Sequence, residues 1–159
     1  MSAKRKERLI SPLTVLVVDD NQYTRKMLRM LLINLGVKTI YEAADGVAAL
    51  DIIRTMSPDL MVLDWEMPML DGPQLIRIIR SPGVFPSPNL PIIMLTGYAE
   101  RWRVTEALRL GVNEFLIKPI SPKALLDRIL SILVKPRPMV KFGKYYGPEP
   151  RKLVAPQCA

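Results

Sequence analysis

Residues 14–20 read TVLVVDD, a run of apolar residues that ends in two carboxylates, Asp19 and Asp20. Three later segments repeat this pattern of an apolar run with a polar end: LMVLD at 60–64, PIIMLT at 91–96 and FLIK at 115–118. Short runs of Val, Ile and Leu are typical of strands that are buried on both faces of a parallel sheet. The four segments therefore predict a parallel sheet.

The rest of the chain alternates with these segments. Strands are expected near 14–18, 38–42, 60–63, 91–95 and 114–117. Helices are expected near 21–35, 46–56, 73–80, 100–110 and 122–134. Ser121 and Pro122 suit the start of the last helix, and the prolines of 81–91 indicate a loop. Five alternations with crossovers of helical length predict a doubly wound α/β fold.

Polar residues at the strand ends are expected to meet in one place. In an open α/β sheet the ligand crevice lies outside the carboxyl ends of the strands. The residues drawn there would be Asp19, Asp20, Asp64, Thr96 and Lys118. Three carboxylates at close range stay ionised only with a cation among them, so the pattern predicts a metal site.

Composition excludes several kinds of chemistry. The 159 residues include no histidine and one cysteine, Cys158, so triads of the Ser-His-Asp kind, the usual zinc sites and a disulfide framework are excluded. No apolar window is long enough to span a bilayer, and no signal peptide follows the basic start MSAKRKERLI. We expect one domain, no transmembrane segment and a cytoplasmic protein.

The net charge of +8 belongs to the two ends of the chain. Residues 1–12 carry four basic and one acidic side chain, residues 135–159 carry six and one, and residues 13–134 carry thirteen of each. We therefore expect a basic N-terminal tail over 1–12, a domain over 13–134 and a basic tail over 135–159 that contains prolines and aromatic residues. Solvated tails are the favoured interpretation. The aromatic and basic residues of the second tail also suit a segment that folds onto a protein surface, its own domain included, whereas nucleic-acid binding is disfavoured.

Five motifs follow one another along the chain: Asp19-Asp20, Asp64, the turn Met67-Pro68-Met69-Leu70-Asp71-Gly72, Thr96 and Lys118-Pro119. In this order they resemble the receiver domain of two-component response regulators. The resemblance covers about residues 13–134. It implies a flavodoxin-like fold with a five-stranded parallel sheet in the order 2-1-3-4-5 and five helices. It also implies a single-domain regulator similar to the chemotaxis receivers.

The resemblance assigns a task to each residue of the acidic site. Asp64 would accept a phosphoryl group as an acyl phosphate. Asp20 would bind Mg²⁺ directly and Asp19 largely through a water, with Asp64 and the backbone carbonyl of Glu66 as further ligands. Lys118 would neutralise the phosphoryl oxygens together with the metal.

The same resemblance implies how the signal leaves the site. A cis peptide bond before Pro119 would aim the preceding lysine into the crevice. Thr96 would move to bond the phosphoryl group, and Phe115 would rotate into the space that it leaves. From the residues alone a core position on the fifth strand is the favoured interpretation of Phe115, and the resemblance makes the switch role an equal alternative. Many relatives have Tyr at this position. Residues 98–134 would form the readout surface, and Glu66 and Tyr98 would tune the phosphoryl lifetime.

The leading hypothesis is a single-domain response regulator in a phosphorelay. It would take its phosphoryl group from a phosphohistidine on a histidine kinase or a histidine phosphotransfer protein, and would then bind a downstream protein. It would not be an enzyme beyond its own phosphoryl transfer and dephosphorylation. The alternative is a phosphorylation-independent interaction module, and the oligomeric state stays open, a homodimer included. A phosphatase-like hydrolase is disfavoured, because that class resembles an Asp-x-Asp motif after its first strand, whereas Asp64 follows the third and Glu66 stands two residues on.

Overall fold

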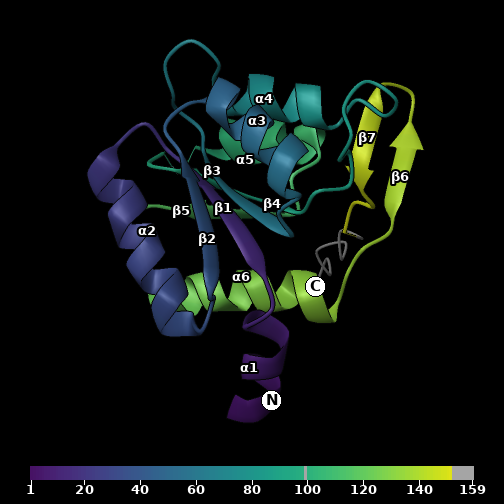
Figure 1. Ribbon diagram of the computed structural model, residues 1–159. Helices are drawn as coiled ribbons and strands as arrows, with labels where there is room; N and C mark the ends of the chain where they lie inside the picture. Colours follow the sequence, from purple (N-terminus) through teal and green to yellow (C-terminus); the bar gives the residue numbers. More distant parts are fainter. Residues whose placement is uncertain (99, 152–159) are drawn as a thin grey trace.

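Five parallel strands form the centre of the molecule (Figure 1). The computed structural model describes residues 1–98 and 100–151. Its main sheet has the order β2-β1-β3-β4-β5, so the predicted flavodoxin-like topology is confirmed. The strands of this sheet are β1 (Thr14–Val18), β2 (Thr39–Ala43), β3 (Leu60–Asp64), β4 (Ile92–Thr96) and β5 (Glu114–Ile117).

Helices cover both faces of this sheet (Figure 1). They are α1 (Ala3–Ile10), α2 (Gln22–Leu35), α3 (Gly46–Met56), α4 (Gly72–Ile79), α5 (Arg101–Leu110) and α6 (Pro122–Val134). One apolar cluster contains residues of α3, α4 and α5 and Leu16 of β1. A second cluster contains residues of α2 and α6 and Val15 and Val17, which flank Leu16 in β1. Neighbouring residues of β1 therefore serve opposite faces, as strand geometry requires.

The described residues contain six helices, whereas five were expected. The additional helix, α1, lies in the segment that we expected to be a solvated tail. Ser2 caps it by accepting from the backbone N–H of Arg5, and Ile10 at its end is fully buried in the cluster that contains α2 and α6. A side-chain cap and one buried apolar anchor favour a helix despite the run of like charges.

The second expected tail also contains regular structure. Strands β6 (Met139–Phe142) and β7 (Tyr145–Pro148) pair as an antiparallel hairpin at the side of the main sheet (Figure 1). Arg137 donates to the backbone oxygen of Asn113 at 2.6 Å, and the Tyr146 hydroxyl pairs with the Asn89 side chain at 2.5 Å. The hairpin therefore folds onto its own domain, while residues 152–159, Cys158 among them, lie outside the described residues.

None of the helices in the described residues is both long and apolar enough to cross a bilayer.

Candidate functional site

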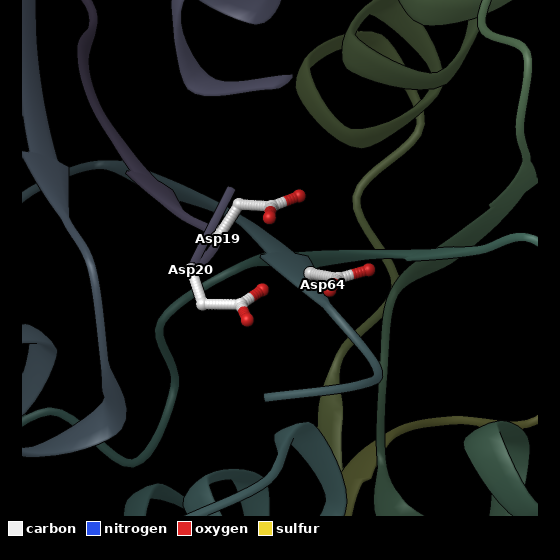
Figure 2. Close-up of side chains that lie close together, drawn as sticks. All are labelled: Asp19, Asp20 and Asp64. Carbon is white, nitrogen blue, oxygen red and sulfur yellow. The ribbon is translucent and has the colours of Figure 1, made fainter. Parts of the chain in front are cut away.

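Three carboxylates converge where β1 and β3 end (Figure 2). Each of Asp19, Asp20 and Asp64 offers a carboxylate oxygen, and these oxygens lie within 4.8 Å of one another. Asp19 and Asp64 are buried, whereas Asp20 faces solvent. Helix α2 begins directly after this pair, and the side chain of Asn21 caps it, so neither aspartate is needed as the helix cap.

Lys118 joins the carboxylates from the end of β5. Its Nζ lies 2.9 Å from Asp64 Oδ1 and 3.4 Å from Asp19 Oδ2. The peptide bond between Lys118 and Pro119 is cis. Burial lowers the pKa of the Lys118 ammonium, but the hydrogen bond and the negative charge of Asp64, with the charge of Asp19, outweigh burial and leave this pKa above its ordinary value.

Asp64 is held in a setting that opposes its ionisation. Burial, together with the charges of Asp19 and Asp20, raises the pKa of the Asp64 carboxyl from 3.8 to about 6, although Lys118 acts in the opposite direction. One lysine is therefore too little positive charge for three neighbouring acids. A divalent cation among the carboxylates would restore the balance.

Thr96 ends β4 and completes the set of predicted strand-end residues. It is buried, and its hydroxyl oxygen accepts from the backbone N–H of Tyr98 at 3.2 Å. A cleft of about 600 Å³ brings the set together, and its walls include Asp19, Asp20, Asp64, Glu66, Thr96, Gly97, Tyr98 and Lys118. All the predicted site residues except Phe115 and Pro119 thus line one cleft.

Phe115 lies elsewhere. It is half-buried on β5 and packs against the apolar cluster of α3, α4 and α5. The site's acidic residues sit at the ends of β1 and β3, and Phe115 is three residues before Lys118 on the strand that carries the lysine. Its contacts in this structure are those of a core residue.

Arg103 is a site residue that the sequence analysis missed. Its guanidinium donates to Glu66 Oε1 at 2.7 Å and to Thr96 Oγ1 at 3.4 Å, and it borders a second cleft of about 490 Å³ that shares Asp20 and Glu66 with the first. Its position within the predicted helix 100–110 was the only available signal. The rotation of that helix, which decides where an arginine side chain lies, was not contained in the motifs.

The arrangement suits a hard cation and an anionic group together. Carboxylate oxygens are the ligands that Mg²⁺ prefers, and an exposed Asp20 leaves one side of the site open to water, which Mg²⁺ usually retains. The carboxylate of Asp64 belongs to this acidic group and also lies 2.9 Å from the ammonium of Lys118. A nucleophilic oxygen, a cation and a hydroxyl around one cleft are the parts that phosphoryl transfer requires.

Comparison with known proteins finds relatives that share about a third of the aligned residues. Residues 15–130 match the family model of the response regulator receiver domain. The chain is 35% identical over 118 residues to chemotaxis protein CheY of Pseudomonas aeruginosa, covering 74% of this chain and 94% of that protein. It is 34% identical over 115 residues to chemotaxis protein CheY-3 of Vibrio cholerae, covering 72% of this chain and 87% of that one.

Solved structures of response regulators have the same fold as this chain. A putative response regulator from Chloroflexus aurantiacus superposes with a TM-score of 0.71 at 32% identity, covering 77% of this chain and 98% of that one. The CheX-CheY-BeF3-Mg+2 complex from Borrelia burgdorferi gives a TM-score of 0.73 at 29% identity, covering 82% of this chain and 99% of that one. The predicted resemblance to chemotaxis receivers is confirmed, and with it a place in two-component phosphorelay signalling. This chain belongs to the family of response regulator receiver domains.

Proposed function

We propose that this protein is a phosphorelay switch that accepts a phosphoryl group on Asp64. The observation that carries the proposal is the position of the Asp64 carboxylate, 2.9 Å from Lys118 Nζ and grouped with Asp19 and Asp20. The donor is a phosphohistidine on a histidine kinase or a histidine phosphotransfer protein, since this chain has no histidine of its own. The alternating core from 13 to 134 acts as the receiver domain.

The transfer is a substitution at phosphorus. An oxygen of Asp64 attacks the phosphorus, a P–O bond forms, and the P–N bond of the phosphohistidine breaks as the imidazole leaves with the electron pair. Lys118 orients the nucleophile and neutralises charge on the transferred group. Mg²⁺, held by Asp19, Asp20, Asp64 and the backbone carbonyl of Glu66, would supply further positive charge beside the phosphoryl oxygens. Water later attacks the phosphorus, releases phosphate and regenerates the carboxylate, so the chain turns over only its own phosphoryl group.

Thr96 and Phe115 would carry the change to the surface. A phosphoryl group adds roughly two negative charges and three acceptor oxygens, which attract the Thr96 hydroxyl. Phe115 would then move into the space that Thr96 leaves. Glu66 and Tyr98 line the cleft, where each can affect the approach of the hydrolytic water.

The readout surface proposed over residues 98–134 has the composition of a binding face. Five large apolar side chains are exposed within this range, namely Tyr98, Trp102, Leu108, Ile117 and Val134. Ala99, within the same range, lies outside the described residues. Exposed apolar groups among polar ones suit a protein partner, and the Borrelia burgdorferi protein is in complex with CheX. The cytoplasmic location of the protein described here stays a prediction.

Incubation with acetyl phosphate and Mg²⁺ tests the acceptor. We expect intact-mass measurement to show a gain of one phosphoryl group, which Asp64→Asn abolishes and omission of Mg²⁺ reduces. Asp51→Asn is the matched control, because Asp51 is exposed on α3 away from the acidic group and should label normally. Labelling that survives Asp64→Asn would place the acceptor elsewhere, and no labelling of the wild type would favour a phosphorylation-independent interaction module.

A further inference from the structure

Arg103 is an arginine whose side chain is only 12% exposed although it lies on a surface helix. Its terminal nitrogens approach Glu66 Oε1 at 2.7 Å and Thr96 Oγ1 at 3.4 Å. Its Nε lies 3.5 Å from Glu100 Oε2. The same guanidinium thus contacts the residue two positions after the acceptor aspartate and the hydroxyl that ends β4.

Three aromatic rings enclose this guanidinium. Its central carbon lies 4.9 Å from the ring centroid of Trp65, 4.6 Å from that of Tyr98 and 5.1 Å from that of Trp102. Trp65 and Trp102 also meet edge to face at 6.1 Å. Rings attract a cation through their faces, so the side chain of Arg103 is fixed in this position rather than extended into solvent.

The position of Arg103 creates a competition for Thr96. In this structure the Thr96 hydroxyl oxygen accepts from Arg103 and from the Tyr98 backbone. A phosphoryl group on Asp64 offers acceptor oxygens to the same hydroxyl. The shift of Thr96 toward those oxygens, proposed above, would break the contact with Arg103, which at 3.4 Å is the longer of its two contacts.

We propose that Arg103 is a positioning residue that holds Thr96 and Glu66 in the resting arrangement and links them to helix α5. The inference rests on the proposed phosphorylation of Asp64. The contact between Arg103 and Thr96 stabilises the resting state alone. It therefore lowers the affinity of the site for a phosphoryl group, which requires the state in which Thr96 has moved away from Arg103. Occupancy of the site therefore releases Thr96 from Arg103 and alters the packing of Trp102, which is exposed on the proposed readout surface.

Beryllofluoride with Mg²⁺ is the probe, because it is a stable stand-in for the phosphoryl group. We expect Arg103→Gln to bind it about two- to tenfold more tightly than the wild type, which is the range for loss of one hydrogen bond. Arg103→Lys should also bind more tightly, because a lysine retains the charge but not the planar fork that reaches both partners. Affinities are measured by titration calorimetry.

Intrinsic tryptophan fluorescence gives a second measurement. The change of emission on beryllofluoride binding would not depend on Arg103 if this residue served only to stabilise the fold. Both tryptophans of the chain, Trp65 and Trp102, contact Arg103. We expect beryllofluoride to change tryptophan emission in the wild type and to change it much less in Arg103→Gln, although this variant still binds. Arg101→Gln is the matched control, since Arg101 is exposed on the same helix and should behave as the wild type.

The outcomes separate this inference from the proposed function. If the wild type fails to bind beryllofluoride, or Asp64→Asn binds it equally well, the proposed function fails. If binding depends on Asp64 but Arg103→Gln shows wild-type affinity and emission change, only the role of Arg103 fails. Weaker binding in Arg103→Gln that Arg103→Lys restores would also overturn it, because Arg103 would then act by attracting the anion. Circular dichroism confirms that each variant is folded.

Discussion

Charge imbalance is the main property of the site at the scale of single residues. Three carboxylates lie together, and two of them contact the ammonium of Lys118, which lies 2.9 Å from Asp64 and 3.4 Å from Asp19. Burial and its acidic neighbours raise the pKa of Asp64 to about 6, so the folded protein holds this proton more tightly than the unfolded chain does. The ionised carboxylate needed for nucleophilic attack is therefore stabilised by a cation more than by the protein alone.

This imbalance predicts how stability depends on pH. Because the pKa of Asp64 is higher in the folded state than the unfolded value of 3.8, its contribution to the free energy of unfolding is complete below about pH 4 and is lost as pH rises through about 6. In the absence of divalent cations, Asp64→Asn should thus be more stable than the wild type at pH 7, with a smaller advantage at pH 4. Urea denaturation at both pH values measures this, with Asp51→Asn as the control. An advantage that is equal at both pH values would contradict the raised pKa.

At the scale of elements, the end of α5 is shaped by the hairpin beyond it. Gly111 caps the helix with φ +92°, and a Cβ there would lie 2.6 Å from the backbone oxygen of Tyr146 and 3.2 Å from Gly147 Cα. Gly36 caps α2 with a similar φ of +107°, but a Cβ at that position would only touch Ile10 at 3.9 Å. The two glycines therefore share a backbone conformation and differ in the space around them.

This difference makes a matched pair of substitutions. Gly36→Ala should cost about 1–2 kcal/mol of stability, the strain of a left-handed L-residue. Gly111→Ala should cost about 1–3 kcal/mol more, since the methyl group must also displace the backbone of β7. Equal losses in urea denaturation would show that the hairpin does not pack on α5 in solution.

The sequence predicted the main elements of the fold but not the two terminal ones. Each of the five expected strands and helices begins and ends within one residue of its predicted bounds, because buried strands are continuously apolar and the helices carry local caps. Helix α1 was missed because its stability depends on Ile10, one apolar residue among charges. The hairpin was missed because long-range contacts hold it, such as those of Arg137 with Asn113. Such contacts leave no periodic pattern in the sequence.

Whole-molecule topology explains why most of the site could be predicted. Asp19, Asp64, Thr96 and Lys118 lie far apart in sequence, but parallel strands place their carboxyl ends at one edge of the sheet. Arg103 reaches the same edge from the side of a helix, and its place depends on helix rotation and on three aromatic neighbours. Neither is determined by local sequence, so the contact of Arg103 with Thr96 became visible only in three dimensions.

Binding of Mg²⁺ should stabilise the whole molecule, because a ligand of the folded state shifts the unfolding equilibrium. At a concentration one hundred times its dissociation constant, Mg²⁺ should add about 2.7 kcal/mol to the free energy of unfolding and raise Tm by about 5–10 °C. Asp20→Asn should reduce this rise at the same concentration, because it removes an exposed carboxylate that has no contact with Lys118 in this structure. An equal rise in this variant, or with NaCl of matched ionic strength, would contradict a site at the acidic group.

Hydrogen exchange with and without Mg²⁺ tests whether the hairpin unfolds together with the main sheet. Tyr146 of β7 contacts Asn89, and Arg137 just before β6 contacts Asn113. Asn89 and Asn113 precede β4 and β5, so the hairpin lies at the opposite ends of these strands from Thr96 and Lys118. Amides that exchange only through global unfolding should slow about hundredfold when Mg²⁺ adds 2.7 kcal/mol. If β6 and β7 unfold with the sheet, their amides should slow by the same factor despite their distance from the metal. Unchanged exchange there, with slower exchange in β1 and β3, would show that the hairpin opens independently and that the receiver domain proposed over 13–134 is the complete folding unit.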